Sequence, residues 1–106
     1  MLVIQCRVGE RVTVGQASLV VVQRLHHHGA ELSITDALAG GAPTLRRCRE
    51  RDLICMDDQV IVRIAKVTQQ RIELVFSAPA QVSIRRVRVR APVGATVIAA
   101  AREASA

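Results

Sequence analysis

The sequence predicts an all-β protein made of two antiparallel units. Its apolar half consists mainly of Val, Ile, Leu and Ala, with one Phe and no Trp or Tyr, a composition that favours pleated strands over helices. Short runs of alternating apolar and polar residues are separated by turn residues, as in an antiparallel meander. The chain also repeats itself at an offset of 42 residues, which indicates a duplicated unit.

The repeat aligns residues 6–35 with residues 48–77 without a gap. Cys6-Arg7 falls on Cys48-Arg49, and conservative apolar matches fill the positions between the identities. A unit of this length can bury little core by itself, so we expect the two copies to complete one another.

The first unit contains four predicted strands joined by short turns. Residues 8–10 have the composition of a turn, and the three histidines at 26–28 with Gly29 form a polar hairpin tip. The alternation places the strands at residues 1–7, 11–14, 18–25 and 31–35.

The second unit repeats this order and adds one strand. Residues 37–43, with two glycines and a proline, are predicted to be a linker. The repeated strands are expected at residues 45–49, 53–56, 60–67 and 72–76, with turns at 57–58 and 68–70. Residues 81–90 alternate strictly and predict a strand that the first unit lacks, and the Ala-rich tail, 93–106, predicts a short helix or disorder.

The net charge of +6 lies entirely in residues 43–106, which hold twelve basic and six acidic side chains. Most of the basic residues are arginines in two clusters, at 46–51 and 85–90. The guanidinium group is a planar fork that suits phosphates and guanine edges. A polyanionic partner would relieve the repulsion between these charges, whereas the alternative is a solvated charged surface.

Other motifs argue against several classes of function. Three cysteines without a close pair predict reduced thiols in a cytoplasmic protein, and no Cys-x-x-Cys spacing suggests a zinc site. Three neighbouring histidines at a hairpin tip cannot all face one metal ion. No catalytic constellation or cofactor motif is visible, so neither an enzyme nor a cofactor is expected. No apolar run is long enough for a membrane span, so no membrane partner is expected.

The N-terminal residues resemble those of the carbon storage regulator family (CsrA, also called RsmA). The resemblance rests on Arg7-Val8-Gly9-Glu10 after a short first strand, on the turn Ser77-Ala78-Pro79, and on the strand that begins Val82-Ser83-Ile84-Arg85-Arg86. The resemblance extends over roughly residues 1–36 and 44–90.

The resemblance implies a fold in which two units interleave. Family members are homodimers of five-stranded chains, so this chain is expected to be a small pseudo-dimeric barrel or sandwich within a single domain, residues 1–92. It would be a monomeric pseudo-dimer or a homodimer. An exposed edge at Leu45–Arg49 could recruit another chain.

The resemblance also implies an RNA site shared by the first strand of one unit and the fifth strand of the other. Such a site binds GGA-containing loops in messenger RNA leaders and regulates translation. On this chain it maps onto Ile4, Gln5, Arg7, Val82, Ile84, Arg85, Arg86 and Arg88.

Two departures keep a second function open. Cys6 stands where the family has a basic residue, and the first unit has no fifth strand, so the second RNA site is expected to be lost. The alternative to a regulator that binds single-stranded or hairpin-loop RNA is a protein-interaction or antagonist module that no longer binds RNA.

Overall fold

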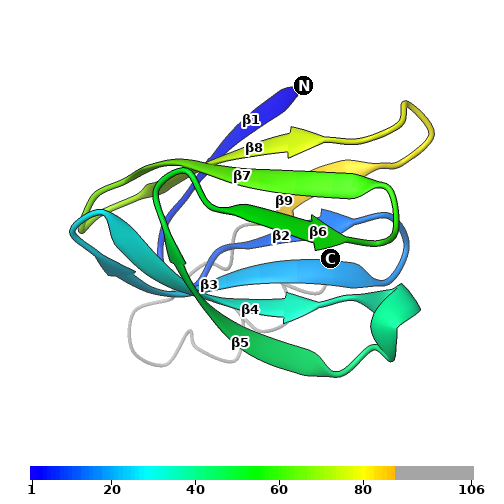
Figure 1. Cartoon of the computed structure of the whole chain (residues 1–106), viewed down its shortest axis with the longest axis horizontal. Coiled ribbons are helices and arrows are strands. Elements are labelled where there is room, and N and C mark those ends of the chain that lie inside the picture. The colour runs from blue at the N-terminus through cyan, green and yellow to red at the C-terminus, as the bar shows by residue number, and fades with distance from the viewer. Residues whose placement is uncertain (88–106) are drawn as a thin grey trace, which may run out of the picture.

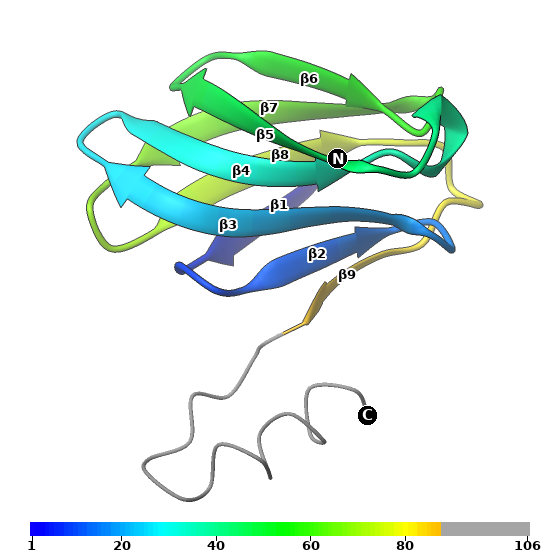
Figure 2. The same cartoon turned by 90° about the horizontal axis from the view of Figure 1, so that it is seen from below.

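The computed structural model describes residues 1–87 of the 106-residue chain. Within these residues the fold is all-β, as predicted, and consists of two antiparallel sheets of four and five strands. The one helical element in this range is a 3₁₀ turn, η1 (Ala37–Ala39), which follows the fourth strand. Figures 1 and 2 show the strands from two directions.

Each sheet combines strands from both repeats. The four-stranded sheet has the order β1 (Leu2–Cys6), β8 (Ile72–Ser77), β7 (Val60–Val67) and β6 (Leu53–Met56). The five-stranded sheet has the order β5 (Pro43–Arg49), β4 (Gly29–Thr35), β3 (Ser18–His26), β2 (Arg11–Val14) and β9 (Ile84–Val87).

The two repeats exchange their first strands. β1 pairs with β8 of the second repeat, so that Leu2 lies opposite Phe76, and β5 pairs with β4 of the first repeat, so that Thr44 lies opposite Ile34. These two residue pairs occupy equivalent positions in the repeat. β9 also crosses over and pairs with β2. Neither repeat therefore completes a sheet from its own residues within the described part of the chain.

The offset of 42 residues is preserved in the backbone. The ladder between β3 and β4 shifts between Val22 and Arg24, and the ladder between β7 and β8 shifts between Ile64 and Lys66, which lie 42 positions later. The duplication therefore extends to a β-bulge, a feature that re-aims a strand and is specific to its position.

The core lies between the sheets and draws on both repeats. Alternate residues of most strands face inward, as expected for a two-sheet fold with one solvated side on each sheet, whereas β5 buries Cys48 alone. Leu32 and its repeat Leu74 are both fully buried, and Phe76, the chain's single aromatic residue, is buried with them. One hydrophobic cluster contains buried residues from β1 to β8, with Ile84 of β9 packed against it.

Several predicted boundaries differ from the structure by one to three residues; β4, for example, begins at Gly29 instead of residue 31. β5 begins at Pro43, inside the predicted linker, because proline is tolerated at the first residue of an edge strand. β9 begins at Ile84 instead of residue 81, because a turn closed by the Val82 N–H and the Pro79 carbonyl (3.0 Å) precedes it. The predicted end of this strand, residues 88–90, and the tail, 93–106, lie outside the described residues.

Candidate nucleic-acid interface

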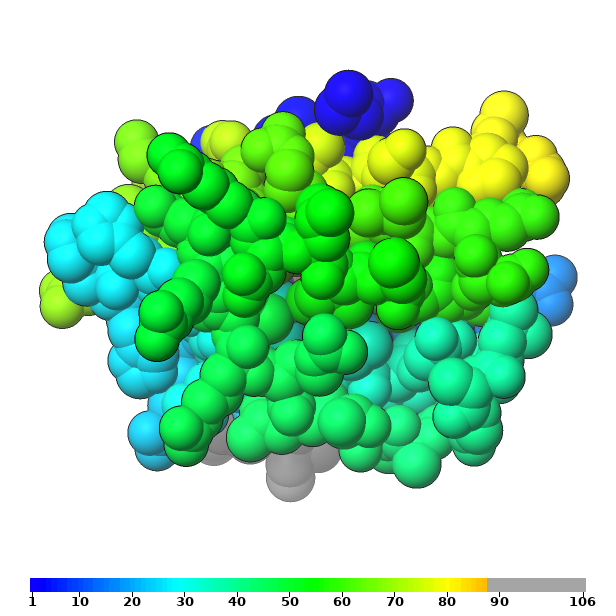
Figure 3. Space-filling view, viewed as in Figure 1, coloured from blue at the N-terminus to red at the C-terminus, as the bar shows by residue number. Residues whose placement is uncertain are grey.

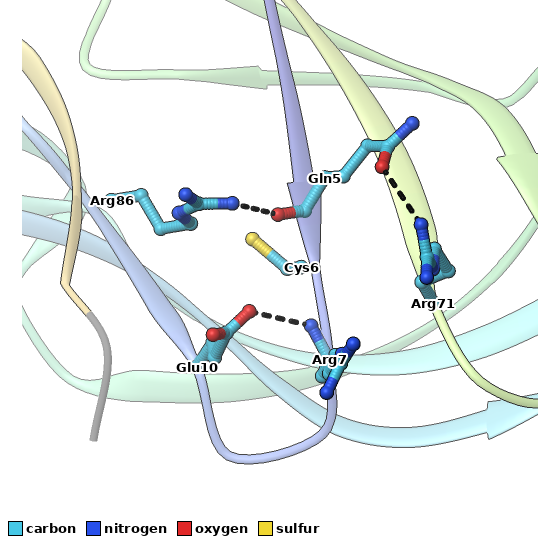
Figure 4. Close-up of a pocket in the computed structure, with 6 residues that line it drawn as sticks. All are labelled: Gln5, Cys6, Arg7, Glu10, Arg71 and Arg86. Atoms are coloured by element: carbon cyan, nitrogen blue, oxygen red, sulfur yellow. Dashed lines mark hydrogen bonds between the residues drawn. The ribbon is translucent and has the colours of Figure 1, made fainter. Parts of the chain in front are cut away.

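The candidate site lies where β1 of one sheet meets β9 of the other. Arg86 Nη1 donates a hydrogen bond of 2.7 Å to the backbone oxygen of Gln5, across a sequence separation of 81 residues (Figure 4). Because β1 pairs with β8 and β9 pairs with β2, this contact joins the two sheets at one edge of the molecule. The structure thus brings together the two segments that the sequence pointed to.

A cleft of about 200 Å³ opens beside this contact. Three arginines and one glutamate give it a net charge of +2, and the opposed side chains are visible in Figure 4. The lining residues are Gln5, Cys6, Arg7, Glu10, Arg71 and Arg86. A positive, polar cleft of this kind suits an anionic or hydrogen-bonding ligand.

Arg71 is a lining residue that the sequence analysis did not single out. In the ladder of β1 with β8, Cys6 lies opposite Ile72, so the next residues, Arg7 and Arg71, are neighbours at the strand ends. Arg71 Nη1 also lies 3.4 Å from Gln5 Oε1. The only signal for Arg71 was its position just after a predicted hairpin tip, and that position becomes informative once the pairing of β1 with β8 is known.

A tight turn holds Arg7 at the mouth of the cleft. The Glu10 carboxylate accepts a hydrogen bond of 2.8 Å from the Arg7 backbone N–H, and the Glu10 N–H donates to the Arg7 carbonyl at 3.0 Å. Gly9 between them has a φ of 91°, a left-handed conformation that glycine adopts at little cost. The backbone of Arg7 is therefore fixed while its side chain remains exposed.

The Cys6 thiol contributes no charge to the cleft. The residue is buried, and burial, followed by the nearby Glu10 carboxylate, raises the pKa of Cys6 to about 11 although Arg86 opposes the effect. The thiol is therefore protonated at neutral pH. A protonated buried thiol is a poor nucleophile, so the cleft has no activated cysteine.

Four of the remaining predicted site residues are described by the structure, and none of them lines the cleft. Ile4 is 9% exposed and belongs to the core, while Val82 and Ile84 are half-buried and pack against it. These side chains position the two strands. Arg85 is exposed and does not line the cleft; its carbonyl accepts a hydrogen bond from Thr13 Oγ1 at 3.3 Å. Arg88 lies outside the described residues.

A second cleft occupies the equivalent place in the other repeat, but its charge is different. Its volume is about 470 Å³, and Arg47, Arg49 and Asp52 replace Gln5, Arg7 and Glu10. Two arginines are balanced by two carboxylates, so the net charge is zero when His26 is neutral. The lining residues are His26, Gly29, Ala30, Glu31, Arg47, Cys48, Arg49 and Asp52.

Two of the three histidines at the hairpin tip each pair with a single carboxylate. His26 lies 3.4 Å from Glu31, and His28 lies 3.1 Å from Glu50. Residues 1–87 contain no group of three His, Cys, Asp or Glu side chains placed to hold a metal ion. The same residues form no helix that is long and apolar enough to cross a membrane.

Comparison with protein-family models, with curated proteins and with solved structures found no match.

Proposed function

We propose that this protein binds single-stranded RNA loops at the cleft between β1 and β9, as a post-transcriptional regulator similar to the carbon storage regulator family. The observation that carries the proposal is the Arg86–Gln5 hydrogen bond, which builds a positively charged cleft from two strands far apart in the sequence. The strand exchange described above supports a pseudo-dimer in which the two repeats take the places of two subunits.

The chemistry of the cleft suits the edges of unpaired bases. A guanidinium group can donate two hydrogen bonds to O6 and N7 of guanine, and loop nucleotides expose these edges. Arg86 has further N–H groups besides the one that Gln5 accepts. No aromatic side chain lines the cleft, since Phe76 is buried in the core, so recognition would depend on arginine and backbone groups instead of aromatic stacking.

The two clefts predict one RNA site per chain. The first cleft carries a net charge of +2, whereas the second is neutral and has no counterpart of Arg86 within the described residues. The position equivalent to Arg71 is Gly29, which removes another cation. Phosphate attraction supplies much of the affinity for nucleic acids, so a neutral cleft would bind weakly.

The test is a titration of the chain with a labelled RNA hairpin that carries GGA in its loop, beside a hairpin with CCA. We expect a 1:1 complex with the GGA loop. Arg86→Ala should weaken it by about 1–3 kcal/mol and reduce the preference for GGA, by analogy with bidentate base contacts. Arg47→Ala, in the neutral cleft, is the matched control and should change little. If Arg47→Ala abolishes binding while Arg86→Ala has no effect, the site is assigned to the wrong cleft.

A second candidate is a protein-interaction module that has lost RNA binding. Cys6, whose thiol is neutral, stands where the resemblance expects a basic residue, and this favours the alternative. The same titration separates the two functions, because this alternative predicts no binding of either hairpin even at low salt, where phosphate contacts are strongest.

A further inference from the structure

The two sheets end differently. In the five-stranded sheet, β9 covers the outer edge of β2, with Val14 opposite Ile84 and Arg11 opposite Val87. β6 is the repeat of β2, yet within residues 1–87 it pairs with β7 alone. The first repeat has no fifth strand, because the chain passes from β4 through η1 directly into β5. The described part of the chain therefore leaves the outer edge of β6 open.

The open edge presents unpaired backbone groups beside an apolar surface. The Ile64 N–H donates to the Asp52 carbonyl at 2.9 Å, so Asp52 directs its backbone toward β7. Because backbone direction alternates along an antiparallel strand, Leu53 and Cys55 direct their N–H and C=O groups outward. Leu53 is 60% exposed and Cys55 is also exposed. Such an edge is a template for strand addition.

The open position also lies against β5. In the first half of the molecule, β1 meets β9, as the Arg86–Gln5 contact shows. The repeat maps β1 onto β5 and maps β9 onto the open position beside β6. Ile4 of β1 is covered, at 9% exposure, whereas its repeat Arg46 is exposed. Figure 3 shows that β5 and β6, in green, occupy the middle of one face of the molecule.

We propose that β6 receives a single extended segment of a partner protein, which presents an acidic side chain to Arg46. β5, in the other sheet, occupies the layer beneath the open position, so the space beside β6 accommodates one strand. If a second copy of the chain paired through its own β6, the five-stranded sheet of that copy would collide with β5. The partner's charge follows from Arg46, which is exposed and replaces the buried Ile4. Backbone hydrogen bonds would supply affinity and the Arg46 contact would supply selectivity.

The pairing of β9 with β2 supplies the design of a probe. A labelled peptide with the sequence of residues 81–87, in which Arg86→Glu is introduced, would place alternate apolar residues toward the core. It would also place a carboxylate beside β5, because Arg86 itself reaches β1, the repeat of β5, at Gln5. We expect the full-length chain to bind it at least tenfold more tightly than the unmodified basic peptide. Nuclear magnetic resonance should show the largest amide shifts at Leu53 and Cys55.

Three variants of the protein and one modified peptide test the location. Arg46→Ala should weaken binding about fivefold or more, whereas Arg47→Ala, on the opposite face of β5, should stay within about twofold. Cys55→Pro removes a backbone N–H that points away from β7 and has no hydrogen-bond partner on that strand. This variant should therefore abolish binding of the peptide. If that variant does not fold, a peptide N-methylated at alternate residues should fail to bind the unaltered chain.

Several results would overturn the proposal. One is unchanged affinity for the N-methylated peptide, or for a folded Cys55→Pro variant. Another is a dimer in light scattering that Cys55→Pro dissociates, since the occupant would then be a second copy. Displacement of the peptide by the GGA hairpin would assign the edge to RNA instead. The proposal does not rest on RNA binding, because the peptide titration is done without RNA and concerns the opposite edge from Arg86.

Discussion

At the scale of single residues, the repeat places unlike side chains in the same backbone conformation. Gly9 has a φ of 91° and its repeat Arg51 has a φ of 78°. Their N–H groups make the same contact, to the carbonyls of Val22 and Ile64. A left-handed conformation costs a non-glycine residue about 1–2 kcal/mol. The second repeat therefore carries strain that the first repeat avoids.

We predict that Arg51→Gly raises the free energy of unfolding by about 0.5–1 kcal/mol. Glycine removes the left-handed cost, and the greater entropy that glycine has in the unfolded chain offsets part of the gain. Urea denaturation measures the difference. Gly9→Ala is the matched control and should lower the free energy of unfolding by a similar amount. A loss of stability in Arg51→Gly would show that the Arg51 side chain makes a compensating contact.

The three thiols should differ in reactivity. Burial raises the pKa of Cys6 to about 11 and also raises the pKa of Cys48, whereas Cys55 is exposed. Because the thiolate is the reactive species, we predict that iodoacetamide at pH 8 modifies Cys55 first in the folded protein. Mass spectrometry over time measures this order. Cys55→Ser should remove the fast phase, and equal rates at all three positions would contradict the buried placement.

At the scale of elements, the Glu50 carboxylate links three segments of the fold that are distant in the sequence. Glu50, in the turn between β5 and β6, accepts a hydrogen bond of 2.8 Å from the Val67 N–H at the end of β7. Its other oxygen lies 3.1 Å from His28 Nδ1, in the tip between β3 and β4. The hydrogen bond from Val67, followed by that from His28, lowers the pKa of Glu50 below its ordinary value of 4.5.

This shift predicts a loss of stability in acid. A group whose pKa is lower in the folded state stabilises the fold above its unfolded pKa, and this stabilisation is lost as the pH falls through the folded pKa. Melting temperatures measured from pH 6 to pH 3 should therefore fall less steeply below about pH 4.5 in Glu50→Gln than in the unaltered chain. Parallel curves for the two proteins would contradict the role given to Glu50.

Local alternation predicted several elements with their observed bounds. The strands at residues 11–14 and 60–67 were placed correctly because their apolar residues recur with the period of two that a half-buried strand requires. The strand at 53–56, which is apolar throughout, was placed correctly because it aligns with residues 11–14 in the repeat. The strand predicted at 81–90 has its described part at 84–87, because a strictly alternating pattern also runs through the turn after Pro79. The period of the apolar residues does not show where a hydrogen-bonded turn ends and a strand begins.

At the scale of the whole molecule, neither repeat forms a complete sheet of its own within residues 1–87. β1 belongs to the sheet formed by β6, β7 and β8, whereas β5 and β9 belong to the sheet formed by β2, β3 and β4. The buried side chains of both repeats pack in one cluster. Cutting the chain between the repeats therefore separates each sheet from a strand that pairs along its edge.

We predict that the fragments 1–42 and 43–106 each fail to fold alone and regain a cooperative transition when mixed in equal amounts. Each fragment loses ladder partners and half of the hydrophobic cluster, and small units with incomplete cores are rarely stable. Circular dichroism during heating measures the transition. A cooperative transition in either isolated fragment would show that the exchange of strands is not required for folding.

The sequence by itself determined the all-β class, the duplication at an offset of 42 and three residues of the cleft, Gln5, Arg7 and Arg86. The class and the duplication follow from local alternation and from self-similarity along the chain. The three cleft residues follow from the resemblance to the carbon storage regulator family. The tertiary structure decided which strands pair. That pairing brought Arg71 into the cleft, left the second cleft neutral and uncovered Arg46 beside the open edge of β6. The pairing of β1 with β8 and of β9 with β2 joins strands roughly 60 to 80 residues apart. It depends on burial and chain closure across the whole molecule, so a local sequence pattern cannot predict it.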